Sequence, residues 1–193
     1  LASANDGGTI GYNPANLAAT SIANYDDPSL AAADPKPWKT ECANSVEVVG
    51  DLDYWSLLRA FRNIHKPWGF GLGYASVSPQ DRTEWWTAGF GTRLGRSNWN
   101  GGVAFQHLGG GILQEKAKNL INVGVQGNYS LPDGVTLQVG GLVQDITGRL
   151  DQGPLYSLGL AATFGKTLVE VDWWDLSDQI DSSVNIGVQH RVD

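Results

Sequence analysis

The stretch INVGVQGNY, residues 121–129, decides the fold class, because its apolar and polar residues alternate one by one. Such alternation is typical of a β-strand whose two faces meet different surroundings. The apolar set is Ile121, Val123, Val125 and Tyr129, and the other set is Asn122, Gly124, Gln126 and Asn128. The polar set contains amides and glycine instead of the Lys and Glu that a water-facing surface usually carries. We therefore expect the polar face to be enclosed and the apolar face to meet lipid.

The same alternation continues from residue 67 to the end of the chain and predicts eight strands. They cover about 67–77, 83–94, 99–109, 119–131, 135–146, 154–164, 167–177 and 182–192. Each is about ten residues long, which matches the roughly 9–11 residues that a tilted strand needs to cross a bilayer. We find no run of 18 apolar residues, so the sequence predicts no membrane-spanning helix.

The predicted links between these strands alternate in character. Those near 96–98, 132–134 and 165–166 are tight, whereas those at 78–82, 110–118, 147–153 and 177–181 are longer or more polar. Outer-membrane barrels have short turns on one side and long loops on the other, whereas a Greek-key sandwich needs long cross-connections. We therefore predict an all-β, up-and-down antiparallel transmembrane β-barrel of about eight strands (eight to ten) over residues 67–193. A soluble ligand carrier with an apolar interior is the alternative.

Composition supports this fold class and argues against several functions. Charged residues make up 17% of the chain, below the roughly 25% usual in soluble domains. The net charge of −7 argues against a nucleic-acid partner. Cys42 is the single cysteine, and the three histidines lack metal-ligand spacing, so we expect no disulfide, metal or other cofactor. His107 and His190 have no neighbouring nucleophile, and we expect no enzymatic activity.

The residues with polar or charged side chains on the enclosed face are candidates for a lumen or constriction. They are Arg93, Gln126, Glu170, Asp172, Gln189 and Arg191. The acids at 170 and 172 lie on the strand next to Arg191, and Arg93 is a second candidate partner across a narrow lumen. This group is either a structural ion pair that sets strand register or a charge constriction that filters solutes.

Aromatic residues cluster near the predicted strand ends, where outer-membrane barrels carry interfacial girdles. The candidate interface residues are Trp68, Trp85, Trp86, Trp99, Tyr129, Tyr156, Phe164, Trp173 and Trp174.

Residues 1–66 are predicted to form an extension with short helices that plugs the barrel, caps it or contacts a neighbouring subunit. Residues 1–44 look irregular apart from a short helix capped by Asn13 with Pro14 at its first position. Residues 45–49 suggest a short strand, and the spacing of Tyr54, Leu57, Leu58 and Phe61 predicts an amphipathic helix over 53–62. The alternative is that residues 45–66 add a ninth and a tenth strand.

The segment GYNPANLA, residues 11–18, resembles a signature near the start of the outer-membrane family related to long-chain fatty-acid transporters. The resemblance rests on Asn13, Pro14, Ala15 and Leu17. It implies a barrel that takes up hydrophobic compounds. That family has about fourteen strands, more than this chain supplies, and Asp193 stands where many outer-membrane proteins end in an aromatic residue.

These observations predict a protein of the bacterial outer membrane, in contact with membrane lipid. Its expected role is a narrow, porin-like channel or binder for small hydrophobic solutes. The alternative is a structural, self-associating subunit of a membrane lattice without transport activity.

Overall fold

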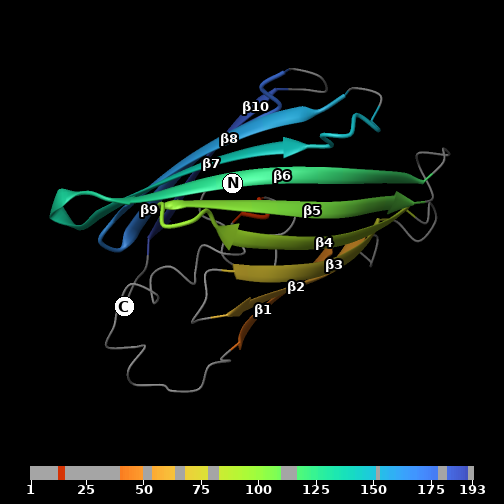
Figure 1. Ribbon diagram of the computed structural model, residues 1–193, viewed down its shortest axis with the longest axis horizontal. Coiled ribbons are helices and arrows are strands. Elements are labelled where there is room, and N and C mark those ends of the chain that lie inside the picture. Colours follow the sequence, from red (N-terminus) through yellow and green to blue (C-terminus); the bar gives the residue numbers. More distant parts are fainter. Residues whose placement is uncertain are drawn as a thin grey trace.

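The computed structural model contains ten β-strands in one antiparallel sheet, in which each strand pairs with its neighbours along the chain (Figure 1). The structure describes residues 13–15, 40–49, 54–63, 68–77, 83–109, 117–150, 153–177 and 182–190. Within these ranges, the one helical element is a 3-10 turn, η2, at Pro132–Gly134. None of the helical structure in the described ranges has the length and apolar character required to cross a membrane.

The strands follow one another without crossovers. They are β1 (Thr40–Val49), β2 (Tyr54–Asn63), β3 (Trp68–Val77), β4 (Thr83–Arg93), β5 (Trp99–Gly109), β6 (Lys118–Ser130), β7 (Val135–Gln144), β8 (Leu155–Phe164), β9 (Thr167–Trp174) and β10 (Ser183–His190). The up-and-down antiparallel prediction is therefore confirmed. The eight strands predicted from residue 67 onward correspond to β3–β10, each within three residues of its predicted ends.

The predicted links lie alternately at the two ends of the sheet, but their lengths do not alternate throughout, because 94–98 and 78–82 each contain five residues. The links at 94–98, 131–134 and 165–166 lie at one end of the sheet, which we call the short-turn end. The links at 78–82, 110–117, 145–154 and 175–182 lie at the other, the long-loop end. Because the strands run up and down in order, each residue's place along its strand gives its height between the two ends.

The predicted helix over 53–62 is wrong, because residues 54–63 form β2. Its apolar residues fit a helical spacing, but Trp55, Leu57 and Phe61 also fit a period of two, and a short apolar run does not separate the two. Pairing decides the outcome, since β2 lies in continuous register between β1 and β3. The prediction of an irregular 1–44 is wrong for 40–44, which belong to β1, and the ninth and tenth strands left open by the sequence are present.

The sheet has two chemically distinct faces, which β6 illustrates. Val123 and Val125 are exposed, whereas Asn122, Gly124 and Gln126 between them are buried. Register partners on neighbouring strands lie on the same face, so these assignments extend across the sheet. We call the face with the exposed apolar residues the outer face and the opposite one the inner face. The first carries the predicted apolar stripes and the second the amide and glycine stripes.

The two edges of the sheet are β1 and β10. Figure 1 shows them at opposite margins of the curved sheet, β1 below and β10 above. Among the described strands, no pairing joins these two edges.

Candidate functional site

A short N-terminal turn, Asn13–Pro14–Ala15, lies against the inner face of the sheet. The Asn13 side chain is fully buried, and its Nδ2 donates to the carbonyl oxygens of Val125 at 3.1 Å and Gly141 at 3.4 Å. These two residues are register partners in β6 and β7, so one amide bridges two strands. The Asn13 Oδ1 accepts from the Ala15 amide at 3.1 Å, which is the predicted capping contact. The rest of the predicted helix lies outside the described residues, as does Leu17.

Two glycines on neighbouring strands make room for this turn. Gly102 of β5 and Gly124 of β6 are register partners on the inner face. A Cβ atom at Gly102 would overlap the backbone of Pro14 and Ala15, and one at Gly124 would overlap Asn13 Oδ1. Real Cβ atoms do not approach other heavy atoms this closely, so both positions exclude a side chain while the turn is in place. The turn therefore has a shaped seat, which we call the glycine seat.

Amide side chains surround the glycine seat and bond to one another across strands. Asn100 Nδ2 donates to Gln126 Oε1 at 3.3 Å, Asn122 Nδ2 to Gln106 Oε1 at 3.4 Å, and Gln138 Nε2 to Asn128 Oδ1 at 3.0 Å. Gln126 is 1% exposed. Buried amides need internal partners, which neighbouring amides provide. We call these six residues the amide belt.

The inner face keeps some unused polar capacity. In the part of the chain that the structure describes, the buried atoms Asn100 Oδ1 and Ser157 Oγ have no hydrogen-bond partner. Buried polar atoms are usually satisfied by protein or ordered water. An ordered water beside each atom would satisfy it.

The structure brings some of the predicted lumen residues into one cross-strand row. Arg93 pairs with Asn100, and Asn100 with Gln126. The row continues through β7 and β8 to Asp172 in β9. The half-buried Arg93 donates from Nε to the Ser97 carbonyl at 2.7 Å, which ties its guanidinium to the short turn.

The acids of β9 have uncharged register partners on β10, since Glu170 pairs with Gly187 and Asp172 with Asn185. Gln189 pairs with Leu168 and is exposed. Arg191 lies outside the described residues, so the predicted ion pair or constriction stays a prediction.

Towards the long-loop end the inner face carries several large apolar side chains. Leu120, Leu142 and Leu155 are buried there, and Trp85 of β4 pairs with Leu108 of β5. Trp85 keeps 38% of its surface exposed. These apolar residues share inner-face rows with polar ones, because Leu120 pairs with Gln106, Leu155 with Gln144 and Leu108 with Lys118.

Two matching β-bulges shape the long-loop end. Asp145 and Asp175 are buried and have positive φ, 54° and 51°. In each case the next residue bonds back to the preceding strand: the Ile146 amide to the Ile121 carbonyl, and the Leu176 amide to the Tyr156 carbonyl. Each pairing is one residue out of step with the regular register, which defines a bulge.

The carboxylates of these two residues hold the bulges in shape. Asp145 accepts from the Thr147 hydroxyl at 2.7 Å and from the Leu150 amide at 2.6 Å, and Asp175 accepts from the Ser177 hydroxyl at 2.9 Å. The sequence analysis missed both. The signal was the repeated pattern Asp–Ile–Thr and Asp–Leu–Ser, in which aspartate tolerates the left-handed conformation and binds a hydroxyl two residues on.

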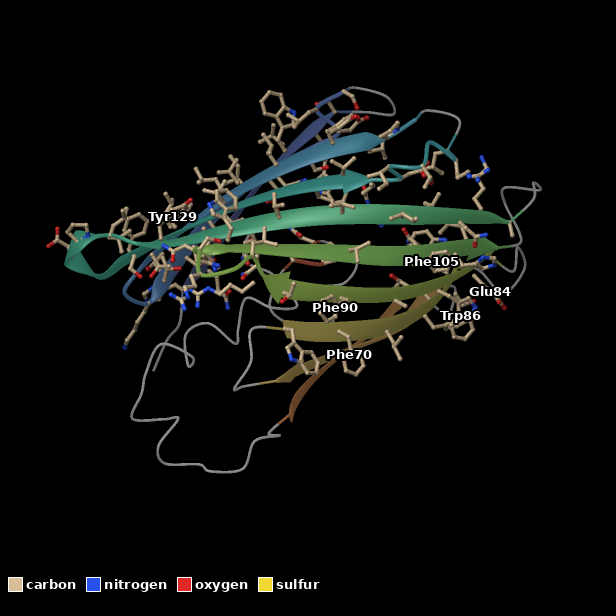
Figure 2. The ribbon with its side chains drawn as sticks, viewed as in Figure 1. Phe70, Glu84, Trp86, Phe90, Phe105 and Tyr129 are labelled. Carbon is tan, nitrogen blue, oxygen red and sulfur yellow. The ribbon has the colours of Figure 1, made fainter. Side chains whose placement is uncertain are left out.

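Most of the predicted interface aromatics lie on the outer face near strand ends. Trp99 and Tyr129 form an edge-to-face pair at the short-turn end, and Tyr74 contacts Trp86 at the long-loop end. Figure 2 shows Tyr129 and Trp86 towards opposite ends of the sheet, with Phe70, Phe90 and Phe105 on neighbouring strands. Tyr156, Phe164 and Trp173 are also exposed on this face, and the half-buried Trp68 stacks on Phe70 and Phe90.

Two of the predicted interface aromatics instead lie on the inner face. Trp85 shares a row with Ala75 and Leu108, and Trp174 pairs with Ser183. The cause is the pleat, because consecutive residues in a strand point to opposite faces. Only one tryptophan of each adjacent pair, Trp86 and Trp173, can therefore contribute to an outer girdle.

Comparisons with known proteins gave no match: no family model, no curated protein and no solved structure resembles this chain.

Proposed function

We propose that this chain is an outer-membrane protein whose sheet forms the wall of a transmembrane β-barrel. Its outer face contacts lipid, and its inner face lines a narrow channel or binding site for small hydrophobic solutes. The N-terminal turn at Asn13–Ala15 acts as a plug in this lumen, because it is seated against the sheet of its own chain.

The observation that carries the proposal is the inverted placement of apolar and polar side chains. Large apolar residues at the centres of strands are half exposed or more, such as Leu72 at 53% and Leu158 at 52%, while Gln126 and Asn100 are buried. In a water-soluble sheet this arrangement would leave a large apolar surface in water, which is unfavourable. In a bilayer the same surface is solvated by lipid.

The vertical spacing of the outer-face aromatics fits a bilayer. Tyr156 and Phe164 lie eight residues apart on β8, which is about 26 Å along the strand. A tilt of about 40° reduces this to about 20 Å of height, close to the roughly 25 Å apolar band of outer-membrane barrels. Between them, Leu158 and Leu160 are exposed on the same face.

The inner face supports the choice of a small, mainly apolar solute. Trp85 keeps 38% of its surface exposed and pairs with Leu108 near the long-loop end, which suits contact with an apolar body. Resemblance of residues 11–18 to the fatty-acid transporter family points to the same solute class. Two tests follow, one for the membrane and one for the solute.

The membrane assignment can be tested with a fluorophore on either face of β8. In a Cys42→Ser background, Leu160→Cys and its neighbour Ala161→Cys carry a polarity-sensitive bimane label in phospholipid vesicles. We expect lipid-borne nitroxide to quench the label at 160 strongly and that at 161 weakly, since Leu160 is 48% exposed on the outer face and Ala161 is buried on the inner face. Equal quenching at both positions, or quenching of 160 by aqueous iodide instead, would contradict the proposal.

The solute assignment can be tested by uptake into proteoliposomes. We expect entry of small apolar solutes to rise above that of protein-free vesicles, and to rise further in a Gly124→Ala variant whose seat no longer admits the turn. If uptake shows no flux and equilibrium dialysis shows no solute binding, the channel and binder role is overturned. The membrane assignment would remain intact.

A further inference from the structure

We propose that β10 pairs with β1 of the same chain and so seals the sheet into a ten-stranded barrel. This inference rests on the proposed function, because it takes the orientation of the chain from membrane insertion. The observation behind it is the condition of β10, a sheet edge that carries none of the usual protection.

Edge strands in folded proteins are normally guarded by Lys, Pro, bulges or short length. The β10 sequence SVNIGVQH contains no Lys, Arg, Asp, Glu or Pro, and its register with β9 continues over eight residue pairs without a bulge. It also keeps the alternation of an interior strand, with Val184, Ile186 and Val188 on the outer face. Ile186 and Val188 are 72% and 70% exposed, the highest values among the exposed large apolar residues in the described ranges. These features fit a strand that has neighbours on both sides.

Strand direction limits the partner. β10 runs from the long-loop end to the short-turn end, and β1 runs the opposite way, because the sheet has an even number of strands. Pairing of β1 with β10 therefore continues the antiparallel pattern. Antiparallel pairing of β10 with β10 of a second copy would place the long loops of the two copies on opposite sides of the membrane, whereas outer-membrane barrels carry them on one side.

The interior favours closure within one chain over a ring of two copies. An eight-stranded barrel is filled by its own side chains, and barrels of sixteen to eighteen strands enclose an aqueous channel. A ten-stranded barrel has room for side chains plus a turn such as Asn13–Ala15. The amide belt around that turn includes fully buried residues, which suits the narrow interior and not the open channel of a twenty-stranded ring.

Closure predicts which face of β10 lies opposite each residue of β1, and the observed register identifies that face. Cys42 of β1 pairs with Phe61, which pairs with Phe70, an exposed residue of the outer face. If each face continues across the seam, Cys42 must lie opposite a residue of the outer-face series in β10. That series is Val184, Ile186, Val188 and His190, and the inner-face series is Ser183, Asn185, Gly187 and Gln189. If the ends of β1 and β10 lie at the same height, Cys42 lies opposite Val188. The strand stagger of a closed barrel shifts this partner by an even number of residues, so the partner stays within the outer-face series.

The native single cysteine makes this testable by cross-linking. Cysteine is placed singly at 184, 186, 188 or 190, with 185, 187 and 189 as matched controls on the same exposed strand. Gly187→Cys is sterically neutral, because a Cβ there meets nothing within 4 Å. The folded full chain in detergent micelles is oxidised with copper phenanthroline, and products are separated on denaturing gels without reductant and mapped by mass spectrometry.

We expect an intrachain disulfide to Cys42 at one or two neighbouring positions of the outer-face series, in at least tenfold higher yield than at the flanking controls. Cys42→Ser should abolish it. Disulfide-linked dimers as the main product would assign the seam to a second copy. Equal yields in both series, or no product at any position, would show that another segment covers β10. Either result overturns the inference.

The bimane measurement keeps the two proposals apart. If the disulfide forms with the expected parity but the label at position 160 is not quenched by lipid-borne nitroxide, closure is supported and the membrane assignment is contradicted. If the label is quenched by lipid but no such disulfide forms, the membrane assignment is supported and closure is contradicted.

Discussion

Asn13 donates its side-chain amide to the carbonyl of Val125, 112 residues further along the chain, at 3.1 Å. This contact is the observed tie between the N-terminal turn and the centre of the sheet. It depends on the absence of side chains at Gly102 and Gly124, and the amide belt lies beside it. A motif noted in the sequence for its family resemblance thus has a defined structural role.

Replacing Asn13 tests this tie. Asn13→Ala removes the donor to Val125 and the acceptor for the Ala15 amide, and loss of such buried bonds costs about 1–3 kcal/mol. Asn13→Asp keeps the acceptor but buries a carboxylate that faces two carbonyl oxygens, so we expect it to release the turn more fully than Ala does. Limited proteolysis before residue 40 in folded protein measures release. Equal protection of all three proteins would contradict the assigned role.

The glycine seat gives a second prediction. Gly124→Ala should displace the turn, because the new methyl group overlaps Asn13, and overpacking of this kind costs about 1–3 kcal/mol. Gly141→Ala is the matched control on β7, since its methyl group would make ordinary contacts of 3.5 Å with Val125 and 3.6 Å with Leu158. Urea titrations read by heat-modifiable gel migration compare the two. A similar midpoint for both variants would show that the seat is not occupied in solution.

The bulge at Asp145 gives a third prediction. Asp145→Ala loses two side-chain hydrogen bonds and places alanine at a φ of 54°, for a combined loss of about 2–4 kcal/mol. Asp133→Ala is the control, because Asp133 is exposed at a similar φ of 67° and should report the conformational cost alone, about 1–2 kcal/mol. The difference between the two urea midpoints measures how much the side-chain hydrogen bonds of Asp145 stabilise the fold. Equal midpoints would show that these bonds contribute no stability.

Depth-dependent charge substitutions on β8 give a fourth prediction. Leu160→Arg, at the centre of the exposed outer face, should reduce folding into vesicles by about 2–4 kcal/mol, whereas Phe164→Arg at the short-turn end should cost about 0–1 kcal/mol. The free energy of folding into phospholipid vesicles from urea measures both. A larger cost at 164 than at 160 would mean that the centre of β8 does not lie in hydrocarbon.

Much of the sheet could be predicted from the sequence, because the alternation of apolar and polar residues within each strand reflects the different surroundings of its two faces. In β8 every second residue from Tyr156 to Phe164 is apolar, and in β6 the outer series is apolar except at Asn119 and Gly127. The predicted ends of both strands differ from the observed ones by at most one residue. The tight turn around Pro132–Gly134 was visible for the same local reason, since turn conformations demand particular residues. β2 was missed because its apolar residues satisfy helical and strand periods together, so only its pairing with β1 and β3 could decide.

The candidate site was less accessible. Gln126 and the acids of β9 were identified as inner-face residues from alternation alone, but alternation does not say which residues of different strands share a row. Arg93, Asn100 and Gln126 lie in one row because of the register between β4, β5 and β6. Trp85 and Trp174 lie on the inner face because of the position at which the apolar series of each strand begins.

By itself, the sequence determined the number and direction of the C-terminal strands and the chemistry of the two faces, because these depend on residues close together along the chain. Tertiary structure alone decided that Asn13 bonds to Val125 and Gly141, that Gly102 and Gly124 form its seat, and that residues 40–49 and 54–63 join the sheet. Those outcomes depend on contacts between distant segments, whose geometry is set by register and packing and leaves no periodic signal in the sequence.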